Sequence, residues 1–435
     1  MIPKLKKFFN NQVNNVSLTF FRVLFGLVLA AEGFGAILTG WVNDVYVDTA
    51  YNFQFFGFEW LGVFHGIPMY FVFTGLGICG VMMACGYRYR LATLGYAVLW
   101  SITYLGQKSS YNNHYYLMFL LTWMSIFIPA NRRFSLDVKQ GRVEPSNKVP
   151  FYLNYFYVMM FAVVYFYAAK NKLYPDWLDG RFIALSTKDS FVNQIPILGG
   201  LIKQSWYPIL VAWCAILYDG LVIPALVWKR TRKLAIFFSV FFHLYNSIIY
   251  QVGVFPYMSL AVLVFFVSDE WLEKWIGRGK KGSFSSKWQM SLNIFLIIFL
   301  LHFMIPLRHH LIPGNVFYTE GGHRLSWRMM LRSKSGYIKI KVVRANGDVE
   351  YVKYKKTLSS KQRRLLYKCP DVLYTYVQKI KKDYSGEDVK IYADVRVGLN
   401  GRKYKQLISP EVDLSKVQWN YFWHNDWINS YGFEE

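Results

Sequence analysis

The sequence predicts a multi-span α-helical membrane protein, with about nine transmembrane helices and a small C-terminal α+β domain. Composition is the first observation: 54% of the 435 residues are hydrophobic and 17% are charged, against about 25% charged residues in an average soluble chain. The second is that the apolar residues form long runs, and the third is that these runs stop near residue 316. The composition excludes a disordered tail, a collagen-like chain and a small disulfide scaffold.

About nine runs approach the length of a membrane-spanning helix, which needs about 17–25 residues. The first run follows Lys4, Lys6 and Lys7 and contains Glu32. It is too long for the core of a signal peptide, so we expect it to be retained as a span. The predicted spans are 16–38, 67–86, 91–106, 114–129, 151–169, 207–228, 234–252, 254–268 and 288–307.

The charges lie mainly between these runs. A net charge of +24, from 50 basic and 26 acidic residues, would suggest nucleic acid as a partner of a soluble protein. Here the positive-inside rule explains it, so we expect no nucleic-acid partner. The outer loop 39–66 has no Lys or Arg, whereas the outer loop 170–206 is an exception with several. We expect the N-terminus and four basic loops to face the cytoplasm and the C-terminal domain to be external; the loops are 87–90, 131–150, 229–233 and 269–287.

The external part has its own pattern. Alternating apolar and polar residues at 337–343 and 389–395 lead to turns at Asn346-Gly347 and Asn400-Gly401, which predicts two β-hairpins. Between them, 358–383 is predicted to be helical. From residue 321 onward there are 23 basic and 12 acidic residues, so this surface is a candidate for attracting an acidic substrate, or is simply a solubilising face. The predicted domains are 1–310 and 316–435.

Four segments are too polar for their apolar surroundings. They are 110–116, 165–180, 242–257 and 321–330. Each also has a structural interpretation: an interfacial aromatic belt with a capping Asn, a lysine reaching toward the interface, or a hydrogen bond between helices. His243 and Asn246 are three residues apart and so share a helix face. The four cysteines form no CxxC pair, and neither they nor the histidine spacing suggests a metal site.

Read together, these segments carry a resemblance. The chain resembles the vitamin K-dependent gamma-glutamyl carboxylases, whose membrane part is also called the HTTM domain. Similar motifs run in order from roughly residue 17 to 427. The matching residues are Asn112, Asn113, His114, Tyr116, Leu117, Ala130, Asn131, Ser135, Asp137, Lys172, Leu173, Asp176, Trp177, Gly180, Phe242, His243, Asn246, Ser247, Ser326, Trp327, Met329, Met330, Ile391, Tyr392, Asp394, Pro410, Val412, Asp413 and Trp419.

The resemblance implies an enzyme that couples oxygenation of vitamin K hydroquinone to its epoxide with addition of CO2 at the γ-carbon of protein glutamate. It implies Lys172 as the catalytic base, with His114 and Asn113 acting on the glutamate side. His243, Asn246, Asp176, Trp177, Ser326 and Trp327 are the candidate substrate-binding or quinone-binding residues. Vitamin K hydroquinone, O2 and CO2 are the implied co-substrates, and no metal is needed. The implied partners are a glutamate-containing protein or peptide, the lipid membrane and a quinone reductase.

The chemistry demanded by that reaction fits these residue types. A γ-hydrogen of glutamate is too weakly acidic for any side chain to remove, so the lysine need only start the process by deprotonating the hydroquinone. Lys172 must be neutral to do so, which burial at an apolar boundary beside Lys170 would favour. The surrounding membrane would keep water away from a carbanion.

Other functions stay open at this point. One is a quinol-oxygenating membrane oxidoreductase that does not carboxylate protein. Another is a transporter, which would be expected to show repeat symmetry and polar residues through the membrane depth. Animal members of the family carry a large additional lumenal region that helps to bind the substrate's propeptide, so the resemblance does not imply how this chain selects a protein substrate. A short bacterial member located in the inner membrane is expected.

Overall fold

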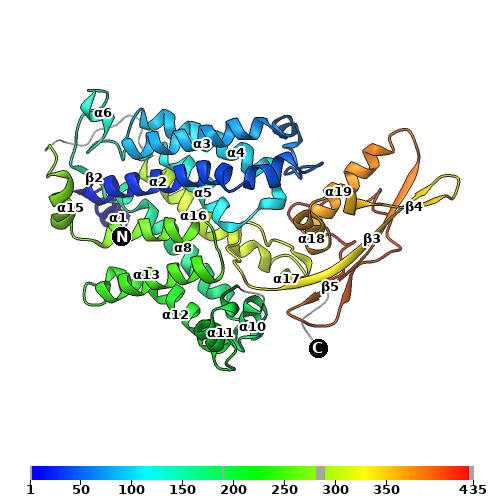
Figure 1. Ribbon diagram of the computed structural model, residues 1–435. Coiled ribbons are helices and arrows are strands. Elements are labelled where there is room, and N and C mark those ends of the chain that lie inside the picture. Colours follow the sequence, from blue (N-terminus) through cyan, green and yellow to red (C-terminus); the bar gives the residue numbers. More distant parts are fainter. Residues whose placement is uncertain (1, 189–190, 281–289, 431–435) are drawn as a thin grey trace.

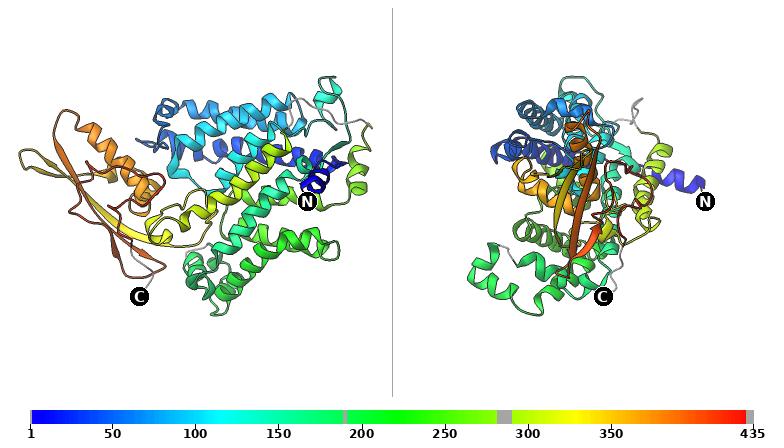
Figure 2. Two further views of the ribbon diagram at one scale, coloured as in Figure 1. Left: turned by 180° about the vertical axis from the view of Figure 1, so that it is seen from behind. Right: turned by 90° about the vertical axis from the view of Figure 1, so that its right-hand side faces the viewer.

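The protein is described here from a computed structural model covering residues 2–188, 191–280 and 290–430. A bundle of helices occupies most of the molecule, and a β-sheet domain with two helices lies at one end of it (Figure 1). The views from behind and from the side in Figure 2 show the same separation.

Each predicted apolar run contains a helix. Their axes lie roughly along the long direction of the bundle, as Figure 1 shows. For the last run, residues 288 and 289 lie outside the described residues. The helices are α2 (Val16–Leu38), α3 (Pro68–Cys85), α4 (Tyr89–Gly106), α5 (Asn113–Ser125), α8 (Phe156–Asn171), α12 (Tyr207–Val227), α13 (Arg232–Ile249), α14 (Phe255–Val262) and α16 (Leu292–Met304).

The number of membrane spans is not confirmed as nine. In the described part of the chain, four helices are long and apolar enough to cross a membrane: Val16–Leu38, Pro68–Cys85, Tyr207–Val227 and Leu292–His310. A fifth would be added if Phe255–Phe266 and Asp269–Ile276, which are bent by 105°, formed one broken span. Of the other runs, α5 and α8 are too short, with 13 and 16 residues, whereas α4 and α13 reach 18 residues but are not apolar enough.

Helices α2 and α3 show how the bundle is packed. A Cβ atom added to Gly26 would lie 2.5 Å from the backbone of Ala84, and one added to Gly33 would lie 2.5 Å from Gly77. A Cβ atom added to Gly80 would lie 2.4 Å from the backbone of Ala30. Small residues therefore let the two backbones touch, which is the usual basis of helix association in membranes.

The two ends of the bundle differ. The N-terminus, α6 (Leu136–Lys139) and α15 (Asp269–Ile276) lie at one end, called the inner end below (Figure 1). At the opposite outer end lie α9 (Pro175–Leu178), α10 (Arg181–Thr187), α11 (Pro196–Ile202) and α17 (Val316–Thr319), next to the sheet domain. The predicted cytoplasmic loops 131–150 and 269–280 fall at the inner end; residues 281–287 of the last loop lie outside the described residues.

The C-terminal domain contains both predicted hairpins. Strands β3 (Lys334–Arg344) and β4 (Val349–Tyr351) form the first, β5 (Val389–Leu399) and β6 (Lys405–Ile408) form the second, and the antiparallel sheet has the order β4-β3-β5-β6. The predicted helix at 358–383 is wrong in one respect: it is two helices, α18 (Ser360–Lys368) and α19 (Pro370–Asp383). Pro370 disfavours helical backbone at Cys369, which is extended with φ −124°.

Candidate active site

Lys172 lies where α8 ends. The chain turns there because Pro175 opens α9 three residues later, and Lys172 forms the C-cap of α8. The side chain is buried, and the residue is 8% exposed. Its Nζ donates a hydrogen bond to the Asp219 carboxylate of α12 and one to the Ala168 carbonyl at 3.3 Å, and it lies 5.3 Å from the centre of the Trp177 ring. The predicted base is therefore buried against a carboxylate rather than held neutral by Lys170, whose amine contacts His310.

His243 joins the same region through two tyrosines. Its Nε2 is 2.8 Å from the Tyr165 hydroxyl and 3.1 Å from the Tyr218 hydroxyl. Tyr218 directly precedes Asp219 in α12, so this network adjoins the Lys172 contact. Within the described residues, Nδ1 of His243 is buried and has no hydrogen-bond partner. The predicted partner Asn246 does not join the network, because its amide donates to the Phe242 carbonyl one turn earlier.

His114 lies in the first turn of α5. Its ring stacks on Phe255, with centroids 4.8 Å apart and planes 18° from parallel. The Phe255 ring is also 5.9 Å from the His243 ring, so one aromatic side chain contacts both predicted histidines. Across the described residues, no direct contact joins His114 to Lys172.

Asn113 connects α5 to the segment at the start of the external domain. Its Nδ2 donates to the Arg328 carbonyl at 3.1 Å. From α8, Asn171 donates to the carbonyls of Ser326 at 3.1 Å and Trp327 at 3.3 Å. The two amides thus hold residues 326–328 between α5 and α8. Trp327 is 1% exposed and has a φ of 51°, a left-handed backbone that is rare for a large side chain and marks a constrained site.

Asp176 and Trp177 form structural contacts. Asp176 accepts hydrogen bonds from both guanidinium nitrogens of Arg402 and, at 2.7 Å, from Asn400, which ties the bundle to the β5–β6 turn. Burial alone would raise the pKa of Asp176, but the hydrogen bonds from Arg402 and Asn400 hold it below its ordinary value. The Trp177 indole donates to the Ala212 carbonyl at 3.1 Å. Their contact with substrate or quinone stays a prediction.

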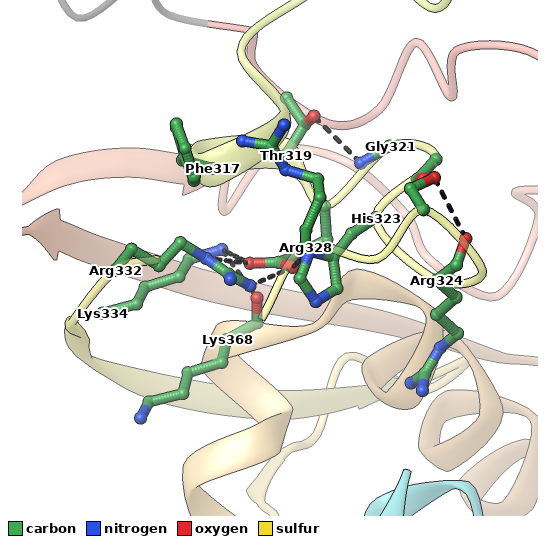
Figure 3. Close-up of polar contacts among 12 residues, drawn as sticks. Phe317, Thr319, Gly321, His323, Arg324, Arg328, Arg332, Lys334 and Lys368 are labelled. Carbon is green, nitrogen blue, oxygen red and sulfur yellow. Dashed lines mark hydrogen bonds and ion pairs between the residues drawn. The ribbon is translucent and has the colours of Figure 1, made fainter. Parts of the chain in front are cut away.

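A cavity of about 440 Å³ lies at the junction of the bundle and the external domain. Glu320 is its most buried acid. In Figure 3 the side chains of Arg332 and Lys334 approach the same carboxylate, and Lys334 also donates to the Lys368 carbonyl at 2.6 Å. Burial would raise the pKa of Glu320, but these cations lower it to about 2. Cations outnumber acids in the lining, which includes Lys108, Arg308, Arg324, Arg332, Lys334 and Lys368 against Glu320 and Asp371.

Comparison with known proteins accounts for nearly the whole chain. Residues 10–271 match the HTTM domain, and residues 287–433 match the lumenal domain of vitamin K-dependent gamma-carboxylase. The chain belongs to the vitamin K-dependent gamma-carboxylase family. No solved structure matches it.

Membership in this family gives the general function. The protein is an enzyme of the carboxylase kind, associated with membranes, whose family uses vitamin K hydroquinone and acts on glutamate-containing protein. The match to a lumenal domain agrees with an external C-terminal domain. The resemblance drawn from the sequence motifs is confirmed; the assignment of individual residues stays a prediction.

Several residues of the candidate site were not predicted from the sequence. Asp219 is the most informative, because an acidic residue inside the apolar run 207–228 should by default be read as functional. Asn171, next to Lys172, gave a weaker signal. The long-range contacts of Asn171 with Ser326, and of Asn113 with Arg328, join residues more than 150 positions apart, which no local pattern reveals.

Proposed function

We propose that this protein is a vitamin K-dependent γ-glutamyl carboxylase. It couples oxygenation of vitamin K hydroquinone to its epoxide with addition of CO2 at the γ-carbon of protein glutamate. The observation that supports this most strongly is the buried contact between Lys172, which matches the family's lysine, and Asp219. Lys172 is a candidate base buried in an apolar site, at the end of the bundle that adjoins the external domain.

The first step needs Lys172 with a free electron pair. Its Nζ takes the proton from a hydroquinone O–H, which leaves an ammonium group on the enzyme and a negative oxygen on the quinol. The Asp219 carboxylate lies beside that ammonium and compensates its charge, because a buried charge needs a partner. Asp219 also fixes the position of the amine.

The surroundings of Lys172 suit a flat apolar ring with oxygen substituents. Trp177 contacts Lys172, and the rings of Tyr218, Tyr165 and Phe255 form a series of contacts that reaches His114. The unpartnered Nδ1 of His243 is a buried polar atom that a quinone oxygen would satisfy. When bound, reduced vitamin K reacts with O2 and supplies the strong base that glutamate deprotonation requires.

We assign binding and deprotonation of the substrate glutamate to the junction between the bundle and the external domain. The junction cavity, whose lining includes residues 321–325, has more cations than acids and would hold a substrate carboxylate. Asn113 anchors the adjoining segment, and His114 lies one residue further along α5, where its ring can hydrogen-bond the glutamate or the carbanion. We further propose a location in a bacterial inner membrane and a partner quinone reductase that regenerates the hydroquinone.

A turnover assay tests the proposal. The full chain in detergent or lipid is supplied with vitamin K hydroquinone, O2, labelled CO2 and a glutamate-containing peptide. We expect acid-stable label in the peptide and an equal or larger amount of vitamin K epoxide, both absent in Lys172→Ala. Epoxide without labelled peptide would instead identify a quinol-oxygenating oxidoreductase and overturn the carboxylase assignment.

A further inference from the structure

The external domain has a second concave surface, remote in sequence from the site above. A groove of about 870 Å³ lies between the edge of β3, the segment that follows β4, and helix α18. We define it as the β3 groove, bounded by Ile338, Tyr354, Lys355, Arg363 and Tyr367. None of the residues assigned to the active site lines it.

One wall of this groove is an open strand edge. Strand β4 pairs only with Lys341–Val343 of β3, and Val352 continues alongside Ile340, so the stretch from Gly336 to Lys339 has no neighbouring strand on that side (Figure 1). The Ile340 carbonyl accepts from Val352 at 3.0 Å and the Ile338 carbonyl accepts from the Tyr354 hydroxyl at 2.9 Å. In antiparallel strands the N–H and C=O of one residue point to the same side. Val352 lies beside Ile340, so the free positions on this side are Gly336 and Ile338. Their amides point toward the groove, and no backbone acceptor among the described residues reaches them.

The groove also carries positive charges that no acidic residue of its lining neutralises. Lys339, Lys355, Arg363 and Arg364 line it, and its lining contains no acidic residue. Across the described ranges, none of the four has a carboxylate within ion-pair distance; Arg363 instead donates to the Lys355 carbonyl at 3.2 Å and to Ser360 at 2.7 Å. Arg344, on another surface of this domain, is by contrast paired with Glu350 and Glu387.

We propose that the β3 groove binds an extended, glutamate-rich segment of the protein substrate as an added strand. The unpaired amides of β3 hydrogen-bond the peptide backbone, and the lysines and arginines attract its carboxylates; this is the usual division between affinity and specificity in strand addition. The groove thus retains the substrate while glutamates elsewhere on the same chain reach the active site. The inference rests on the proposed function, since it names where that substrate docks.

Kinetics with two substrates tests this docking. The double variant Lys355→Glu/Arg364→Glu changes two exposed groove cations, and Lys382→Glu/Lys390→Glu makes the same charge change on exposed residues outside the groove. For a long acidic peptide, the groove variant should raise KM by about tenfold or more, and the control by less than about twofold. For a short peptide with one glutamate, neither variant should change kcat or KM. Equal KM values for the long peptide in the groove variant and the wild type would overturn the proposal.

A binding measurement separates this inference from the carboxylase assignment. The probe is a fluorescent peptide of about ten residues, the upper length of a typical strand, with alternating glutamates. Anisotropy should show binding to the wild-type full chain, at least about tenfold weaker binding to the groove variant, and weakening with salt. That result would support peptide binding in the β3 groove even if the turnover assay found no carboxylation. N-methylation of the peptide amides along one edge of the peptide should abolish binding, whereas N-methylation along the other edge should not. Equal effects of the two modifications would overturn strand addition. Equal displacement of the peptide by anionic lipid vesicles from the wild type and from the groove variant would also overturn it.

Discussion

Both ends of the helical bundle bury polar residues that match the family's motifs, but the two ends use them differently. At the inner end, the Asp137 carboxylate accepts hydrogen bonds from the backbone amides of Arg88 at 2.7 Å and Tyr89 at 3.0 Å, and from the Asn131 side chain at 2.7 Å. It therefore caps the start of α4. At the outer end, Lys172 faces the carboxylate of Asp219, and His243 keeps one ring nitrogen without a partner in the described part of the chain.

The difference shows how to separate structure from function among buried polar residues. Burial is common to both ends, because Asp137 is 3% exposed and Lys172 is 8% exposed. What differs is the partner. The Asp137 carboxylate is occupied by backbone amides at the start of a helix, which is a structural role, whereas a buried amine beside a carboxylate is a candidate for acid–base chemistry.

The largest expected effect is that of Lys172→Ala. Without the amine no proton is taken from the hydroquinone, so epoxidation and carboxylation should both fall by about 10²–10⁴-fold. Assays of both products in protein of normal yield check this, and a small added amine should restore part of each. Loss of carboxylation with normal epoxidation would move the base elsewhere.

The comparison of the two ends is tested directly by a pair of matched variants. Asp219→Asn keeps the shape of its side chain but removes the charge that stabilises protonated Lys172, so we expect epoxidation to fall by about 10²-fold. Asp137→Asn at the inner end should lower thermal stability, in line with a lost cap of about 0.5–2 kcal/mol, while activity per folded molecule changes less than about threefold. If both variants lost activity equally per folded molecule, the distinction drawn here would be wrong.

A smaller effect is expected at His114. His114→Ala should reduce carboxylation by about tenfold more than epoxidation, because oxygenation can proceed while formation or capture of the carbanion fails. The ratio of epoxide to carboxylated product measures this uncoupling. Phe255→Leu, which removes the stacking partner but leaves the imidazole, provides a control for ring position. An unchanged ratio in His114→Ala would remove His114 from the glutamate side.

The sequence predicted the elements better than their contacts. Apolar runs located the main helices of the bundle, and the Asn-Gly turns located both hairpins, because the required left-handed backbone appears at Gly347 with φ 90° and at Asn400 with φ 48°. The Cys369-Pro370 pair marks the point where the predicted helix 358–383 divides, because the residue before a proline disfavours helical backbone. The predicted count of nine spans is not confirmed, because α5 and α8 are too short, and α4 and α13 not apolar enough, to meet the requirements of a full span.

For the site, the sequence identified Lys172 and His243 but could not show what they touch. Asp219 lies 47 residues from Lys172 and Tyr165 lies 78 residues from His243, so only the packing of α8 against α12 and α13 brings these groups together. The structural contacts of Asp176 with Arg402 could not be foreseen for the same reason, since they cross the boundary between the two domains.

Acid stability tests the junction between the regions. The pKa of Glu320 is lowered from 4.5 to about 2 because Arg332 and Lys334 outweigh the effect of burial. A lowered pKa means that the carboxylate stabilises the fold fully above about pH 4.5 and that this contribution, up to about 3 kcal/mol, is lost as the pH falls toward 2. The melting temperature of the full chain between pH 6 and 3 should fall less steeply in Glu320→Gln than in the wild type. Parallel curves would show that Glu320 is not held ionised by these cations.

The smallest effect is expected at Lys170, which compares two lysines within the outer end itself. Lys170 precedes Lys172 by two residues and so lies on a different face of α8, where its Nζ is 2.6 Å from His310 Nε2 at an exposed position. It contacts neither Asp219 nor the His243 network in the described residues. Lys170→Ala should therefore change epoxidation and carboxylation by less than about twofold, within the range of exposed charge contacts. Product assays beside Lys172→Ala check this, and an inactive Lys170→Ala with an active Lys172→Ala would show that the base has been assigned to the wrong lysine.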